Sequence, residues 1–253
     1  MAISGTYAFN PDISEIVEEA FERAGLEMRS GYDLRTARRS LNILTLEWQN
    51  RGINLWTVDE STIDETAAGV SLGSPEYLKK GTADYNLDTG TISLLGLVLR
   101  TDEGSATAQM DYRLARVSQP TYATIPNKLT QARPLQYYFQ RREILGAAAG
   151  GTDQKDKINL WPVPDADSKY KIIYWRLKRI SDTGDIASNT MQIPGRFIPA
   201  LISGLAYHLA MKRPEAAPRA QMLKQAYEEE FRMAAEEDRE KASVRFVPHI
   251  QGY

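Results

Sequence analysis

Two regions with helical periodicity stand near the ends of this chain, and a long β-rich stretch separates them. The first helical pattern follows Asn10-Pro11, where Asn suits the N-cap and Pro the first helical position, and it stops at Gly25, a typical left-handed C-cap. A second pattern, from about Asp33 to Asn50, ends before Gly52. Two amphipathic helices so close in sequence predict an antiparallel pair.

The helical period returns after residue 193 and continues to about residue 241. One apolar stripe is expected over Ile198, Leu201, Ile202, Leu205 and Leu209, and Pro214 should end that helix. A fourth helix should follow at once, with Pro218 in its first turn and an apolar stripe from Ala220 to Ala234.

Between these regions the chain reads as short strands separated by turn residues. The expected strands are 55–58, 92–100, 110–117, 135–141, 157–161 and 170–180, with a short turn of helix at 118–124. Such spacing is typical of a sandwich or barrel. At 146–152 the run GAAAGGT has no side chain able to hold a loop, so a mobile hairpin tip is expected there.

We therefore predict an α+β protein with three parts. Residues 1–54 and 191–242 form one discontinuous, antiparallel helical domain, 55–190 a sandwich- or barrel-like insertion, and 243–253 an extended C-terminal tail.

Composition argues against several classes of function. Lys and Arg number 31 and Asp and Glu 33, so the formal net charge is −2, which is a weak basis for holding DNA. Cysteine is absent and the two histidines lie far apart, so thiolate chemistry, zinc sites and histidine triads are not expected. No nucleotide-binding motif occurs. We expect no cofactor, no metal, no signal peptide and no membrane anchor.

Several charged groups admit two interpretations. The acidic runs 228–230 and 236–238 could supply paired carboxylates, but their spacing favours a solvated helix face. Asp165 and Asp167 suit either a cation or a turn, and His208 is expected to be a packed or surface residue. The basic run from Lys169 to Arg179 could face a polyanion or protect a strand edge.

The tail is the strongest candidate for a binding segment. It lacks helical period, includes Pro248, and places sizeable apolar side chains within ten residues. Because a free segment of this kind would expose them to water, we expect it to lie against a partner. The candidate docking residues are Val244, Arg245, Phe246, Val247, His249, Ile250 and Tyr253.

The order of elements and several motifs resemble the head-to-tail connector, or adaptor, proteins of short-tailed bacteriophages. The run ARRSLN at 37–42 followed by EWQNRGI at 47–53 is similar to the family's helical pair and the turn that ends it. IPNK at 125–128, RPLQYY at 133–138 and LWPVPD at 160–165 are similar to a recurrent pattern of phage structural proteins.

The resemblance implies a virion subunit of the neck that is synthesised in the host cytoplasm and has no enzymatic activity. It implies a homo-oligomeric ring of about twelve copies below the portal protein, with DNA passing through the lumen without specific binding. The tail would dock on the portal, and the tip, with Gly146, Gly150 and Gly151, is a possible contact for a tail nozzle or another tail protein. A virion-associated enzyme such as a peptidoglycan hydrolase is the alternative, and a nucleic-acid-binding protein is a third interpretation.

Overall fold

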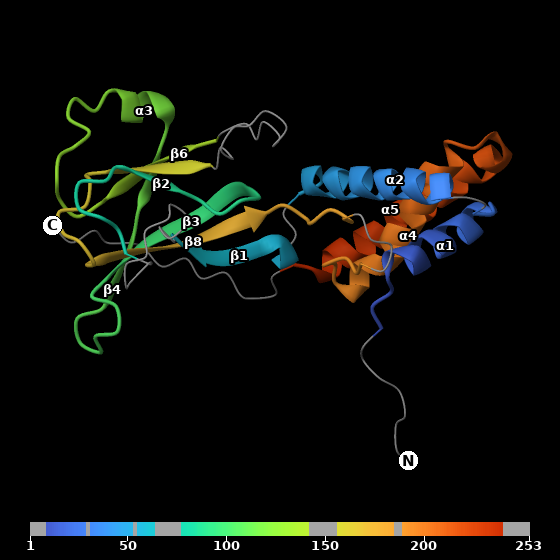
Figure 1. The fold of residues 1–253 in the computed structure, drawn as a ribbon, viewed down its shortest axis with the longest axis horizontal. Coiled ribbons are helices and arrows are strands. Elements are labelled where there is room, and N and C mark those ends of the chain that lie inside the picture. Colours follow the sequence, from blue (N-terminus) through green and yellow to red (C-terminus); the bar gives the residue numbers. More distant parts are fainter. Residues whose placement is uncertain are drawn as a thin grey trace, which may run out of the picture. The chain divides into compact units, whose positions relative to one another are not determined.

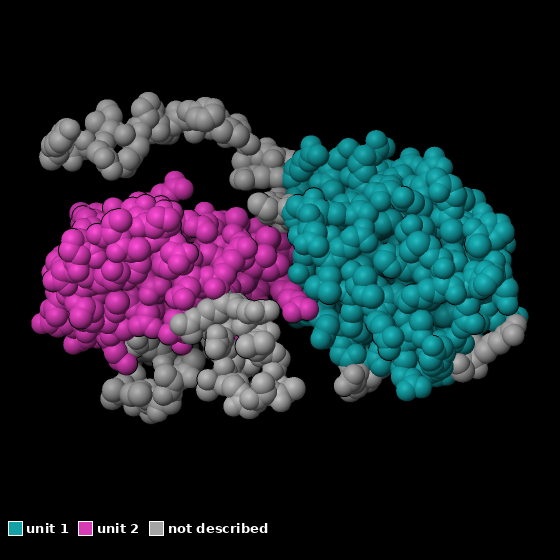
Figure 2. All heavy atoms as spheres, turned by 90° about the horizontal axis from the view of Figure 1, so that it is seen from above, with its two compact units in different colours: residues 1–56, 180–253 teal, residues 57–179 magenta. Residues whose placement is uncertain are grey.

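The computed structural model describes residues 9–28, 31–52, 55–63, 77–141, 156–184 and 189–239. It confirms the α+β class, since both helices and sheets are present. The chain divides into two compact units, which we call the helical unit (residues 1–56 and 180–253) and the sheet unit (residues 57–179), coloured separately in Figure 2. The helical unit is thus made of two chain segments with the whole sheet unit inserted between them in sequence.

The described part of the helical unit contains four α-helices (Figure 1). They are α1 (Ile13–Ala24), α2 (Gly31–Asn50), α4 (Ile198–Ala210) and α5 (Ala220–Glu237), and two 3₁₀ turns, η4 (Gly195–Phe197) and η5 (Pro214–Arg219), precede α4 and α5. Pro218 therefore lies in η5, not in the first turn of the last helix.

The first helix begins two residues later than the Asn10-Pro11 pattern predicts. Asp12 is its N-cap: the Asp12 carboxylate accepts a hydrogen bond of 2.9 Å from the Glu15 backbone N–H, and the Glu15 carboxylate accepts one from the Asp12 N–H. This reciprocal pair satisfies two free amides at once, which a single Asn side chain cannot do. At the other end, Gly25 is the predicted left-handed C-cap, with φ of 71°.

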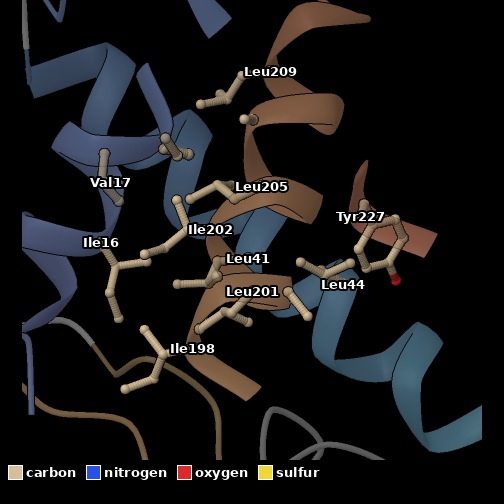
Figure 3. Packing of buried hydrophobic residues seen from close by; sticks show 14 of the residues in the cluster. Ile16, Val17, Leu41, Leu44, Ile198, Leu201, Ile202, Leu205, Leu209 and Tyr227 are labelled. Carbon is tan, nitrogen blue, oxygen red and sulfur yellow. The ribbon is translucent and has the colours of Figure 1, made fainter. Parts of the chain in front are cut away.

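Helix α4 is the centre of the helical unit. The sequence predicts one apolar stripe on it, but α1, α2 and α5 all pack against it, and Figure 3 shows Val17 of α1 and Tyr227 of α5 on opposite sides of it. Its buried residues therefore cover most of its circumference: Ile198, Ala200, Leu201, Ile202, Ser203, Gly204, Leu205, Ala206, Leu209 and Ala210. Half of these are small, which lets neighbouring helices approach closely.

An aromatic cluster joins α2 to α5 and to the turn before α4. The Trp48 ring is fully buried, and its centroid lies 5.7 Å from that of Phe197 and 5.3 Å from that of Phe231. Its indole Nε1 donates a hydrogen bond of 2.9 Å to the hydroxyl of Tyr227. The buried donor is thereby satisfied, and the register of α2 against α5 is defined.

The sheet unit consists of two open four-stranded sheets. One has the order β1 (Val58–Thr62), β8 (Tyr170–Lys178), β3 (Thr91–Thr101), β4 (Met110–Arg113); the other has the order β2 (Asp84–Asn86), β7 (Lys157–Trp161), β6 (Gln136–Gln140), β5 (Ala115–Val117). All pairings are antiparallel except β5 with β6. Neither sheet closes into a barrel, so that alternative is wrong.

Both sheets contribute to one core, as in a sandwich. Leu97 and Leu99 of β3 and Tyr174 of β8 meet Phe139 of β6 and Leu160 of β7 in a single buried cluster. The short helix α3 (Gln119–Ala123) follows β5 at the predicted place, with the Ser118 hydroxyl accepting from the Thr121 N–H. Among the described residues, no helix has the length and apolar character needed to cross a membrane.

The close approach at Gly204 gives a stability prediction. A Cβ at this position would lie 2.9 Å from Leu44 Cδ2 and 2.9 Å from Tyr227 Cε2, whereas a Cβ at Gly31 meets nothing within 4 Å. Overpacking of this kind costs about 1–3 kcal/mol. Gly204→Ala should therefore be about 1–3 kcal/mol less stable than the matched variant Gly31→Ala in urea unfolding followed by the helical circular dichroism signal. Equal stability of the two variants would contradict this packing.

Candidate functional site

The residues predicted from the sequence to bind partners lie outside the described residues. They are Val244, Arg245, Phe246, Val247, His249, Ile250 and Tyr253 of the tail and Gly146, Gly150 and Gly151 of the tip. Candidate sites in the described part of the chain therefore come from charged and titratable groups that the fold brings together.

The largest such group lies where α2 meets α5. The Arg51 guanidinium is 2.6 Å from the Glu47 carboxylate, one turn earlier on α2, and 2.7 Å from that of Glu228 on α5. It also lies over the rings of Tyr227 and Phe231, 4.8 Å from each centroid. Arg51 thus joins two helices by ion pairs and cation–π contacts.

Titratable groups in this cluster are held in their neutral or paired forms. Burial raises the pKa of Tyr227 well above its usual range, so its hydroxyl stays protonated. Burial also lowers the pKa of His208, and this outweighs the opposing effect of the Glu47 carboxylate 3.6 Å away. At neutral pH His208 is an uncharged, largely buried side chain, so of the two predicted alternatives, packed or surface, it is the packed one.

A hollow of about 600 Å³ on α5 is the place where paired carboxylates could act, since Glu228, Glu229 and Glu236 line it. A general acid in glycoside hydrolysis needs a raised pKa. Here the hydrogen bond from Arg51 lowers the pKa of Glu228. That carboxylate is arranged to hold an ion pair, not to donate a proton.

Four residues of the acidic runs are exposed, as predicted for a solvated face, but Glu230 is half-buried and Asp238 is buried. Glu230 lies 3.6 Å from Arg23 of α1, and the nearly buried Asp238 accepts a bond of 2.5 Å from Arg196 of η4. With Arg51 and Glu228, these pairs connect α5 to three other elements. These partners lie far away in sequence, so the spacing within the helix does not indicate them.

The basic run from Lys169 to Arg179 does not protect a sheet edge, and two of its cations are paired within the sheet unit. Strand β8 lies inside its sheet, between β1 and β3, so it has no free edge. Lys171 is buried and lies 3.0 Å from Glu103, while Arg176 lies 3.1 Å from Asp59 and 3.4 Å from Asp88.

Tyr174, one of the aromatic residues within this run, is equally internal. Tyr174 is fully buried, and its hydroxyl donates a bond of 3.0 Å to Asp88. Burial is the main cause that raises the pKa of Tyr174 to about 12. A contiguous basic surface around Tyr174, which a nucleic-acid-binding protein would need, is therefore not what this strand provides.

The two aspartates after Pro164 act as turn residues. Asp165 accepts a hydrogen bond of 2.7 Å from the Tyr170 hydroxyl, and Asp167 accepts one of 2.7 Å from the Lys80 backbone N–H. Over the described ranges, the His, Asp and Glu side chains form no cluster of three that could hold a metal ion.

The lowered pKa of His208 predicts a pH dependence of stability. Between the folded pKa and the unfolded value of about 6.5, the unfolded chain binds more protons, so stability decreases as pH falls below about 6.5. His208→Gln should reduce the slope of unfolding free energy against pH in this window. The matched change His249→Gln alters the other histidine of the sequence. If His249→Gln removed the slope of unfolding free energy against pH and His208→Gln kept it, the assignment of this slope to His208 would be wrong.

Comparison with known proteins gives a family match. The model of the SU10 adaptor protein family matches residues 34–248, which include most of α2, all of α4 and α5, and the whole sheet unit. None of the curated proteins matches the chain. The family match confirms the resemblance to phage head-to-tail adaptors, and a phage adaptor is a structural component of the virion. The chain belongs to the SU10 adaptor protein family.

Proposed function

We propose that the chain is the subunit of a ring that joins the portal protein to the tail in the neck of the virion. About twelve copies form the ring, and its lumen leaves a channel through which DNA passes. The observation that carries this proposal is the match to an adaptor family over residues 34–248, which extends from α2 through the sheet unit and into the predicted tail.

The helical unit is the part suited to form the ring. Its core is complete within one chain, because α4 is covered by α1, α2 and α5. The outer faces of α1, α2 and α5 are then available for neighbouring subunits. A subunit that folds on its own and associates through surface faces can be stored free and assembled when needed.

The charge distribution suits passage of DNA without binding. The formal net charge is −2, and the cations Lys171 and Arg176 of β8 are paired within the sheet unit. Strong binding of phosphates requires many unpaired Lys and Arg side chains, and it would slow DNA during ejection. The proposed function requires no catalytic residue, cofactor or metal.

Cryo-electron microscopy of purified virions tests the proposal directly. We expect a closed ring of this protein between the portal and the first tail component, with the helical unit making the contacts between subunits. Single copies, or copies placed away from the portal vertex, would refute the assignment. Mass measurement of the chain alone and mixed with portal protein would report whether the ring needs the portal in order to form.

The tail supplies the proposed attachment to the portal. Phe246, Val247 and Tyr253 would fill pockets on the portal, while Arg245 would pair with an acidic rim. The helices whose side chains build the core of the helical unit end at Glu237, before this segment begins.

Deletion of residues 243–253 should therefore leave the helical circular dichroism unchanged and abolish or greatly weaken co-sedimentation with portal protein. Deletion of 146–151 is the matched control: it should keep portal binding and weaken addition of the next tail component. Portal binding by the 243–253 deletion at the level of the intact chain would contradict the docking role. Loss of folding would show that the tail belongs to the core of its own subunit.

A further inference from the structure

The exposed face of α1 is mainly acidic, and Arg23 is the cation among its glutamates. Glu15, Glu18, Glu19 and Glu22 are all exposed on it. Glu15 belongs to the capping box and Glu19 lies 3.0 Å from Arg23. Glu18 and Glu22 make no ion pair with any residue that the structure describes.

A groove of about 510 Å³ runs beside this face. Its floor is apolar, because Ile16 of α1 and Ile198, Pro199 and Ile202 of α4 line it, and the four glutamates line it as well. Phe9, with 80% of its surface exposed, also contributes to the lining. A partner that fits this groove should combine cationic groups with apolar side chains.

Helix α2 of the same chain presents such a surface. Arg35, Arg39, Ile43 and Leu46 are spaced by four, four and three residues and are exposed, so they form one stripe on its outer face. Ile43 and Leu46 are 49% and 42% exposed, so the stripe carries two large aliphatic side chains beside its two arginines. Within the described ranges, Arg35 and Arg39 have no ion-pair partner.

We propose that the α2 stripe of one subunit lies in the α1 groove of the next subunit in the ring. Arg35 and Arg39 would form ion pairs with Glu18 and Glu22. The two arginines are four residues apart, as are the two glutamates, and four residues correspond to a rise of about 6 Å along a helix. Ile43 and Leu46 would cover the apolar floor. This inference rests on the proposed ring and assigns its contact surfaces.

The charge pattern also decides the symmetry of the contact. A two-fold contact through α1 would place glutamates against glutamates, and one through α2 would place arginines against arginines, both of which are repulsive. The buried side chains of α1 and α2 reach α4 from different sides, as Val17 and Leu44 show in Figure 3. Different faces of one subunit therefore meet two neighbours in a head-to-tail contact, which gives a ring when the rotation between subunits closes.

The absence of cysteine from the sequence makes a clean cross-linking test possible. Glu22→Cys and Arg39→Cys, combined in one full-length chain and built into assembled particles, should give disulfide-linked multimers on mild oxidation. The matched control combines Glu22→Cys with Met222→Cys, since Met222 of α5 is 62% exposed but lies outside the α2 stripe. The control should remain largely monomeric under the same conditions.

Charge reversal gives the second arm of the test. Arg39→Glu alone and Glu22→Arg alone should each reduce the yield of assembled rings, and the combined variant should restore it. Two results would overturn the assigned contact while the proposed adaptor function stands. In the first, the ring assembles normally, but disulfide-linked multimers form in the Met222→Cys control and not in the Arg39→Cys combination. In the second, the combined charge-reversal variant does not restore the yield of assembled rings. Particles that contain no ring of this protein would overturn both the contact and the proposed function.

Discussion

Burial of α4 around most of its circumference is the constraint on which the helical unit depends. The helix has no solvated face large enough to be stable alone, so α1, α2 and α5 must cover it together. Helices α1 and α2 precede the sheet unit in sequence, and α4 and α5 follow it. The core of the helical unit therefore forms between two chain segments that the sheet unit separates in sequence. Because the entropic cost of closing a long loop grows slowly with its length, this core tolerates a large insertion.

Periodicity was sufficient to locate the four helices and most strands, because it reports which side chains are large and apolar. It failed where small or polar residues do the packing. Gly204 and Ser203 are not apolar positions in the pattern, yet both are buried on α4. The sequence therefore indicates one apolar stripe, whereas the structure buries most of the circumference of the helix. Strand β2, with the sequence DYN, is too short and polar to have a pattern of its own and exists through its pairing with β7.

Charges were harder to interpret than apolar residues because an ion pair depends on a partner that sequence distance hides. Arg176 belongs to a basic run, but Asp59 and Asp88 neutralise it from far along the chain. Arg51 and Glu228 are likewise separated by most of the chain. The tail and the tip, in contrast, were identified from local composition, which is why they could be proposed as contacts without any knowledge of the fold.

The proposed contact between subunits has a strength that suits assembly on a partner. Exposed ion pairs contribute only about 0.2–1 kcal/mol each, so Arg35, Arg39, Glu18 and Glu22 with a small apolar patch hold two free subunits weakly. If the tails dock on the portal as proposed, neighbouring subunits would face each other at an effective concentration in the millimolar range, at which weak contacts are occupied. Ring closure then gives every subunit two such contacts. A subunit with such weak contacts would stay monomeric until the portal is present. Rings would then not assemble away from a capsid.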